Sequence, residues 1–281
     1  MRTVLIPTDF STNARHAIDY ALLLHKNEPT IFYFLHAYAD KVYSTLKSDG
    51  NGNIVTQKKV IKQHTELKLN KLVTEIKSKT NNPKHTYEAV LAFESLVDVV
   101  NDFVKQIDVD LIIMGTQGQT SNKKITFGSN TVQVFKYVQC PVLAVPEDYI
   151  FEQPKKVLFP TDYMLPYKLR ELKLLRDIAV AFKSEVHCLY ISDFENLSQR
   201  QLKNQKYILD VLYDANLFFD RIPSKHRVEA ILKHVTNKEI DILVMINSRH
   251  SFLEDMLYRS TVDELGLNIK TPFLVMQNLP R

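Results

Sequence analysis

The sequence has little cysteine, little net charge and no long apolar run, and each shortage argues against a class of protein. Two cysteines, Cys140 and Cys188, in 281 residues make a disulfide framework implausible and suit a reducing cytosol. Lys and Arg number 36 against 32 for Asp and Glu, so we expect no nucleic-acid partner. Neither a signal peptide nor an apolar run of membrane-spanning length occurs. We therefore expect a soluble, cytoplasmic protein with no membrane partner.

The motifs of common catalytic and metal sites are missing as well. Neither the P-loop pattern G-x4-G-K-[ST] nor the nucleophile pattern G-x-S-x-G occurs, and neither cysteine has a basic neighbourhood. The nine histidines show no metal-ligand spacing with cysteine or acidic residues. The sequence therefore predicts no catalytic residue and no metal ligand set.

The clearest pattern in the chain lies in residues 110–146. An apolar run, LIIM, is typical of a parallel strand that is buried on both faces. Gly115 and Gly118 follow it, and Gly128 with Ser129 completes the spacing G-x2-G-x9-G-S. Ser129 is a good helix N-cap, and three apolar residues at helical spacing follow it. The pattern predicts a strand, a glycine-rich loop and a helix start.

This arrangement suits the capture of an anion. A glycine without a Cβ lets the backbone approach a ligand, and the first amides of a helix carry partial positive charge. Ser129 can add a hydroxyl donor. The alternative is that the glycines only turn the chain and that Ser129 only caps a helix.

The spacing, with the CPVLAVP segment after it, resembles the nucleotide-binding signature of universal stress proteins of the ATP-binding class. The N-terminal segment VLIPTDFS resembles that family's first strand and its aspartate-bearing turn. The resemblance implies a five-stranded parallel sheet in the order 3-2-1-4-5, with helices on both faces. It also implies a bound ATP, which Mg²⁺ can accompany. The ATP-binding residues are then expected to be Pro7, Thr8, Asp9, Ala37, Met114, Gly115, Thr116, Gly118, Gly128, Ser129 and Asn130.

Asp9 leaves two interpretations open, since an aspartate before a helix commonly caps it, whereas the intact motif favours contact with a nucleoside or a metal. Capping alone accounts for Asp162. We also expect Thr8 and the strand end at His36 and Ala37 to line the adenine side of the pocket.

An internal repeat sets the domain count. VLIPTDF at residues 4–10 is echoed by VLFPTDY at 157–163, an offset of 153, and DLIIM at 110–114 by DILVM at 241–245, an offset of 131. We expect two α/β domains of the same doubly wound, Rossmann-like fold, at residues 1–148 and 154–281. The first copy is longer, and we place most of the excess in a surface loop at residues 40–57.

The second copy departs from the motif. At the offset of 131, Ile246, Arg249 and Arg259 replace Gly115, Gly118 and Gly128. We expect these side chains to fill the pocket, so that the second copy does not bind ATP in the family's manner. The two arginines either capture a different anion or lie in solvent.

Within each copy, strands and helices are expected to alternate. In the second copy we expect strands near 156–160, 185–191, 227–232, 242–246 and 273–276, with helices at 165–182 and 197–219. Terminal strands at 142–145 and 273–276 are expected to join the copies as an intrachain pseudo-dimer, and a homodimer of such tandems stays open.

We interpret the chain as an ATP-binding universal stress protein, a nucleotide-responsive regulator that acts through its first domain. A slow ATPase or phosphotransferase ranks second, because phosphoryl transfer recruits several positioned charges and Asp9 is the one obvious candidate. A scaffold of the same fold without a ligand is the third interpretation.

Overall fold

The computed structural model describes residues 1–49, 53–118, 127–248, 253 and 270–278. The chain divides into two compact units, Met1–Ser121 with Gly128–Val142 and Asn122–Phe127 with Leu143–Arg281. Each unit is built on a parallel sheet with helices on both faces. No helix in the described ranges has both the length and the apolar character needed to cross a membrane.

The first repeat alternates strands and helices from its first residues. Its elements are β1 (Arg2–Pro7), α1 (Thr12–Leu24), β2 (Thr30–Ala37), α2 (Ala39–Asp49), α3 (Ile54–Thr80), β3 (His85–Ala92), α4 (Leu96–Ile107), β4 (Leu111–Gly115), α5 (Ser129–Tyr137) and β5 (Val142–Val145). Their order in the sheet is β3-β2-β1-β4-β5, so the predicted order 3-2-1-4-5 is confirmed.

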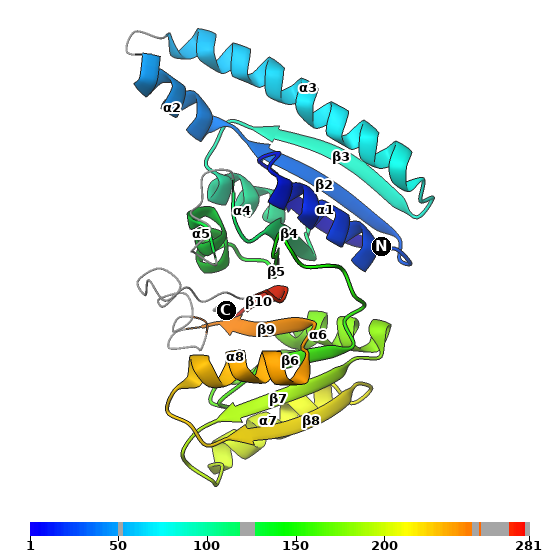
Figure 1. The fold of residues 1–281 in the computed structure, drawn as a ribbon, viewed down its shortest axis with the longest axis vertical. Helices are drawn as coiled ribbons and strands as arrows, with labels where there is room; N and C mark the ends of the chain where they lie inside the picture. The colour runs from blue at the N-terminus through cyan, green and yellow to red at the C-terminus, as the bar shows by residue number, and fades with distance from the viewer. Residues whose placement is uncertain (50–52, 119–126, 249–252, 254–269, 279–281) are drawn as a thin grey trace. The chain divides into compact units, whose positions relative to one another are not determined.

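Helices pair on each face of this first sheet. Ion pairs join α1 to α3, from Arg15 to Glu75 at 3.3 Å and from Lys79 to Asp19 at 3.6 Å. The long α3 runs along β3 and β2 (Figure 1). Packing of α4 against α5 includes a bond from the Asn101 side chain to a carbonyl at the end of α5. Among the strands of this sheet, β4 is buried at every residue, whereas β3 is intermediate or exposed throughout.

The second repeat has the same order of strands. Its elements are β6 (Lys156–Pro160), α6 (Leu169–Phe182), β7 (Glu185–Ile191), α7 (Gln199–Val211), β8 (Asn216–Ile222), α8 (Arg227–Lys238), β9 (Ile242–Asn247) and β10 (Phe273–Gln277). The sheet order is β8-β7-β6-β9-β10, again 3-2-1-4-5. In Figure 1, α7 lies behind the strands and α8 in front of them. An ion pair from Arg176 to Asp214 at 2.8 Å joins α6 to the end of α7.

Strand register confirms the internal repeat. Val4 and Leu111 are partners between β1 and β4, and Val157 and Ile242 are partners between β6 and β9. These pairs keep the offsets of 153 and 131 residues.

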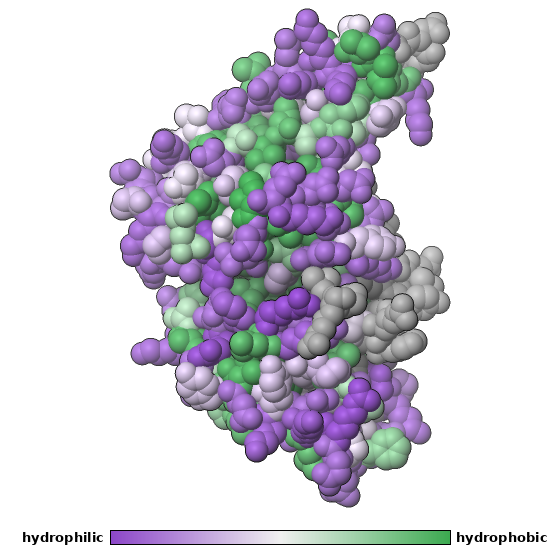
Figure 2. Space-filling view, turned by 180° about the vertical axis from the view of Figure 1, so that it is seen from behind, coloured by the Kyte–Doolittle hydropathy of each residue, from purple (hydrophilic) through white to green (hydrophobic). Residues whose placement is uncertain are grey.

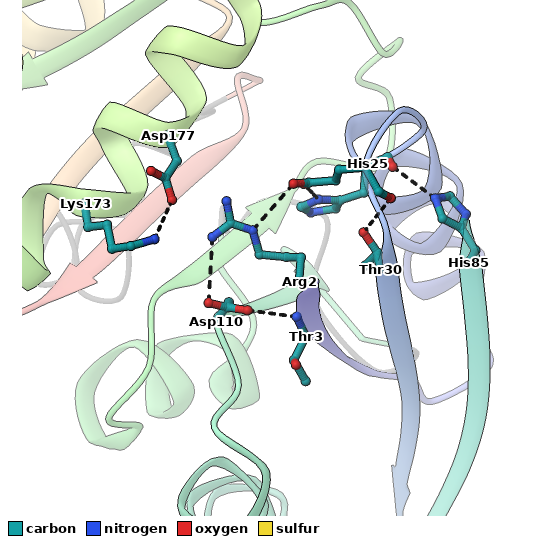
Figure 3. A network of polar contacts seen from close by, with 9 residues as sticks. Arg2, Thr3, His25, Thr30, His85, Asp110, Lys173 and Asp177 are labelled. Atoms are coloured by element: carbon teal, nitrogen blue, oxygen red, sulfur yellow. Dashed lines mark hydrogen bonds and ion pairs between the residues drawn. The ribbon is translucent and has the colours of Figure 1, made fainter. Parts of the chain in front are cut away.

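Equivalent aspartates hold the amino ends of both sheets. Asp110 accepts the Thr3 amide at 2.8 Å, and Asp241 accepts the Lys156 amide at 2.8 Å. Figure 3 shows Asp110 with Arg2, whose Nη1 lies 3.7 Å from its carboxylate. The same contact therefore joins the first strand to the residue before the fourth strand in both repeats.

The expected loop at residues 40–57 is wrong. Residues 39–49 form α2, and α3 begins at Ile54, with residues 50–52 outside the described part. The reason is apolar spacing, because Val42 and Leu46 stand one helical turn apart and pack with Tyr38 and Ile61.

The expected strand at residues 227–232 is also wrong. These residues begin α8, and the third strand of the second repeat is β8, whose first residues, 216–219, the sequence analysis placed at the end of a helix at 197–219. Val228, Ile231 and His234 are buried at a spacing of three residues, which is a helix face rather than a strand face. Residues 216–222 are half-exposed at an edge, so their alternation is weak.

The visible surface is mostly hydrophilic. In Figure 2, hydrophobic side chains show between hydrophilic ones in separate groups. Scattered exposure of apolar side chains is normal for a folded protein and marks no binding site by itself.

Candidate functional site

A pocket opens in the first unit at the carboxyl ends of β1, β2 and β4. In a doubly wound sheet this is the place where the strand order reverses and where ligands bind. The pocket contains about 590 Å³ of empty space, part of it open to solvent. It is lined by Pro7, Thr8, Asp9, Ala14, His36, Ala37, Asp40, Leu96, Met114, Gly115, Gln117, Gly118, Asn130 and Thr131.

The turn after β1 presents Asp9 to this pocket. The amide of Thr8 donates to the Leu35 carbonyl of β2 at 2.8 Å, which extends the sheet by one bond. Phe10 then takes a left-handed conformation, with φ of 65°, and its amide donates to the Thr8 hydroxyl at 3.1 Å. Asp9 Oδ1 accepts the Ser11 amide at 3.0 Å. The turn is therefore held by its own side chains.

The N-cap of α1 is Ser11 and not Asp9. Its Oγ accepts the Ala14 amide at 3.1 Å. Capping therefore does not explain Asp9, whose other oxygen faces Gly118. The same correction applies to Asp162, because Lys168 is the N-cap of α6.

Gly115 ends β4 where no side chain fits. A Cβ on Gly115 would lie 1.6 Å from Oδ1 of Asn13, which is buried at the start of α1. The same Asn13 oxygen accepts the Gln117 amide at 3.3 Å. A Cβ on Gly118 would lie 3.0 Å from Asp9 Oδ2, so this glycine allows the loop to approach the aspartate. Both glycines serve close approach rather than a positive φ.

The start of α5 closes the base of the glycine-rich loop. The Gly128 amide donates to the Thr116 carbonyl at 2.8 Å. Thr131, which is buried, donates its hydroxyl to the carbonyls of Gly115 and Thr116, both at 3.1 Å. Gly128 is the N-cap, so the predicted capping by Ser129 is wrong, and Ser129 is the first helical residue. Because a glycine cap has no side chain, no cap side chain bonds the first amides of α5.

His36 borders the pocket as a part-buried ring. Its Nδ1–H donates to the Thr8 carbonyl at 2.6 Å, and its ring centroid lies 4.8 Å from that of Phe10. Burial lowers the pKa of His36, although the bond to Thr8 and the charge of Asp9 oppose that shift. A lowered pKa favours a neutral imidazole near neutral pH.

Most of the predicted ATP-binding residues lie around this one pocket. Those that line it are Pro7, Thr8, Asp9, Ala37, Met114, Gly115, Gly118 and Asn130. Thr116, Gly128 and Ser129 do not line it, and the first two instead close the loop base. His36, which was expected to line the adenine side of the pocket at the end of β2, is also among the lining residues.

The sequence analysis missed five lining residues. These are Ala14, Asp40, Leu96, Gln117 and Thr131. Asp40 and Leu96 follow the carboxyl ends of β2 and β3 by a few residues, which is a usable signal once the strand order is known. Thr131 lies at the third helical position of the motif.

The equivalent region of the second unit contains bulkier side chains. Its connection after β6 takes eight residues, 161–168, where β1 is followed by four, 8–11. Tyr167 from this longer connection is buried, and its hydroxyl bonds the Thr161 hydroxyl at 2.5 Å. Ile246, which replaces Gly115, is buried as well. Arg249 and Arg259 lie outside the described residues.

Neither cysteine is placed for nucleophilic chemistry. Both are buried and outside any disulfide. Burial raises the pKa of Cys188 to about 12 and raises that of Cys140 as well, and Cys140 donates to the Val109 carbonyl at 3.3 Å. The thiols are therefore packing residues.

Two doubly wound repeats, the first with a glycine-edged pocket at its switch point, define a tandem Rossmann-like α/β protein. A model described as the Universal stress protein family matches residues 1–146. A universal stress protein of Synechocystis sp. is 24% identical over 99% of this chain and 100% of its own length. One from Methanocaldococcus jannaschii is 31% identical over 51% of this chain and 94% of its own length. The chain belongs to the universal stress protein family.

A solved structure has a similar fold over nearly the whole chain. The crystal structure of a universal stress protein from Archaeoglobus fulgidus has a TM-score of 0.71, covering 98% of this chain and 96% of that one. The sequence identity is 17%, so this likeness concerns the fold alone.

Proposed function

We propose that the first repeat binds ATP in this pocket and that the chain acts as a nucleotide-responsive regulator in a stress response. The observation that carries the proposal is the convergence of Asp9, Gly115, Gly118 and Asn130 on one pocket at the strand switch point. These residues come from the two segments that share the family's sequence pattern. A cytoplasmic location belongs to the proposal.

The residues present fit a nucleoside triphosphate in two parts. Thr8, His36 and Ala37 lie where the strands β1 and β2 end, which suits the base and the ribose. Gly118 and the first turn of α5 suit the phosphates, because backbone amides at a helix start carry partial positive charge.

Charge favours ATP together with a divalent cation. Asp9 and Asp40 line the pocket, and none of its described lining residues is Lys or Arg. Two carboxylates beside a triphosphate repel it unless a cation lies between them. Oxygen donors of this kind suit Mg²⁺. Asp9 is the residue that we assign to this role.

The second repeat, in this proposal, does not bind ATP, because Tyr167 and Ile246 take space that small residues leave open in the first. The proposed domains are residues 1–148 and 154–281. An intrachain pseudo-dimer through 142–145 and 273–276 and a homodimer of tandems stay part of the proposal. The oligomeric state in solution tests the homodimer.

The proposal is tested by titration calorimetry of the full chain with ATP, with and without Mg²⁺. We expect one ATP per chain and tighter binding with Mg²⁺. Gly118→Arg, which copies the second repeat, should abolish binding and leave the fold intact by circular dichroism. Gln63→Arg adds the same charge on the exposed side of α3 and should bind like the parent.

Several outcomes would revise the proposal. Equal affinity in Gly118→Arg and the parent would overturn the site assignment. Two ATP per chain would show that the second repeat is competent. Steady phosphate release would favour the ATPase, and the absence of any binding by the parent would favour a scaffold.

A further inference from the structure

Three titratable side chains meet between α8 and the sheet of the second unit. His187 is on β7, Asp220 on β8 and His234 on α8. One ligand atom from each lies within 4.8 Å of the others. Asp220 Oδ2 is 3.0 Å from His187 Nδ1 and 3.5 Å from His234 Nε2. It therefore lies between the two imidazoles.

The strand register explains why these groups share a face. His187 and Phe218 are partners on adjacent parallel strands, and their rings stack at 5.0 Å. Asp220 is two residues beyond Phe218, so its side chain is on the same face of β8. α8 packs on this face, and His234 points from its buried side, one turn after Ile231.

The two imidazoles are nearly excluded from water. The side chains of His187 and His234 are 7% and 9% exposed. His234 Nε2 is buried and, among the described residues, has no hydrogen-bond partner. An orphaned buried nitrogen is costly and needs an explanation. A cation between His234 and Asp220 supplies one.

A second carboxylate lies on the other side of His187. Glu185 Oε2 is 3.6 Å from His187 Nε2, on the ring edge opposite Asp220. Ligating histidines almost always direct their second nitrogen to a carboxylate or a carbonyl, which fixes the tautomer. Glu185 is placed for that role, with Nδ1 of His187 facing the Asp220 side.

We propose that His187, Asp220 and His234 form a binding site for a divalent transition-metal cation of the Zn²⁺ class. Two imidazoles and one carboxylate are a donor set for Zn²⁺, whereas Mg²⁺ and Ca²⁺ prefer oxygen donors throughout. With metal–ligand bonds of about 2.0–2.2 Å, donor atoms around a tetrahedral ion lie roughly 3.3–3.5 Å apart. The cluster reaches that geometry by small side-chain shifts, and water supplies the fourth ligand at the part-exposed Asp220 side.

Such a site would fasten α8 to the two outer strands of the second repeat. It is independent of the proposed nucleotide pocket, whose lining residues all belong to the first unit. The sequence analysis predicted no metal ligands, because 33 residues separate His187 from Asp220 and 14 separate Asp220 from His234. The competing explanation is a metal-free polar cluster of the same three side chains.

The test uses the full chain after treatment with a chelator and its removal. Calorimetry with Zn²⁺ should show one tight site per chain, and Co²⁺ should give the visible absorption of a low-coordinate site with nitrogen ligands. Zn²⁺ should also raise the melting temperature, since a ligand that binds only the folded state stabilises it. Failure of the parent to bind either ion would overturn the proposal.

Matched variants locate the ion. Asp220→Asn keeps the shape of the side chain, and we expect it to weaken Zn²⁺ binding by about 10- to 100-fold or more, and likewise His234→Gln. His64→Gln removes an exposed histidine of α3 and should bind like the parent. If Asp220→Asn and His234→Gln are folded and bind Zn²⁺ like the parent, the ion is held elsewhere and the assignment is wrong.

Discussion

The two repeats keep the same backbone turn after their first strands but surround it with different side chains. In both, an amide donates back to a threonine hydroxyl, at 3.1 Å to Thr8 and at 3.0 Å to Thr161. In both, the residue that donates this amide is aromatic and has a positive φ, 65° at Phe10 and 56° at Tyr163. The turn therefore belongs to the fold and does not by itself mark a ligand site.

The difference lies in what fills the space beyond that turn. In the first repeat small residues, such as Ala14 and Gly115, leave a pocket. In the second, Tyr167 bonds Thr161, and the buried Glu171 accepts the Asn278 side chain at 3.2 Å. The first repeat therefore has an open pocket at this place, whereas the second has polar side chains that bond each other. In our proposal, the second repeat lacks ligand binding because of the size of these side chains and their internal bonds, while the sheet order stays the same.

The largest change in stability that separates the two repeats is expected at Ile246. Its side chain is 5% exposed, whereas its equivalent, Gly115, has no side chain to lose. Ile246→Ala should lower the free energy of unfolding by about 2–5 kcal/mol, because it leaves a cavity in β9. Urea denaturation followed by circular dichroism measures this. A loss of less than about 1 kcal/mol would mean that the second repeat tolerates the open form.

The reverse change tests the first repeat. Gly115→Ala places a Cβ 1.6 Å from Asn13 Oδ1 and should destabilise the chain by about 1–3 kcal/mol through overpacking. Asn13→Ala removes that carboxamide, so the double variant should be more stable than the sum of the single changes predicts. Strictly additive effects in the urea midpoints would show that the contact with Asn13 is not the cause.

Thr131 gives a smaller effect at the base of the loop. Thr131→Val keeps the shape and removes the bonds to the Gly115 and Thr116 carbonyls, so we expect a loss of about 1 kcal/mol and weaker ATP binding. Thr131→Ser keeps the hydroxyl and is the matched control. The offset of 131 pairs Thr131 with Val262, which is outside the described residues. Equal ATP affinity in the valine and serine variants would remove Thr131 from the binding proposal.

The repeats were accessible from the sequence because they depend on strong local patterns, and the sheet order was expected from the family resemblance that those patterns carry. The apolar runs before Thr8 and Thr161 fix the first strands, and the spacing of Gly115, Gly118 and Gly128 marks one loop. Strand β8 was missed because an exposed edge strand lacks a clean alternation. The N-cap of α5 was misplaced by one residue, since Ser129 has the better intrinsic capping preference and Gly128 takes the position.

Contacts between distant segments could not be obtained in this way. Asn13 determines why Gly115 has no side chain, yet 102 residues separate them, and no spacing rule joins the two. The cluster of His187, Asp220 and His234 needs the register of β7 and β8 and the placement of α8, and the sequence analysis misassigned both β8 and the start of α8. Local periodicity predicts elements, whereas such sites need the register between them.

The smallest expected effect concerns the ring beside the turn. His36 and Tyr190 occupy equivalent positions in the two repeats, because Leu35 is the strand partner of Pro7 and Leu189 is the strand partner of Pro160. The first repeat therefore has a histidine where the second has a tyrosine. Each ring packs on the residue of positive φ, at 4.8 Å on Phe10 and at 5.8 Å on Tyr163. Burial lowers the pKa of His36, so below its unfolded value of about 6.5 the unfolded chain binds more protons than the folded one.

Stability should therefore fall as the pH decreases from about 6.5 toward the lowered pKa of His36 in the folded state. His36→Gln keeps an N–H for the Thr8 carbonyl and cannot titrate, so its melting temperature should fall less steeply over that pH range. His64→Gln, at an exposed position, should keep the slope of the parent. If the His36→Gln and parent slopes coincide, the pH dependence arises elsewhere, and the first repeat does not differ from the second in this respect.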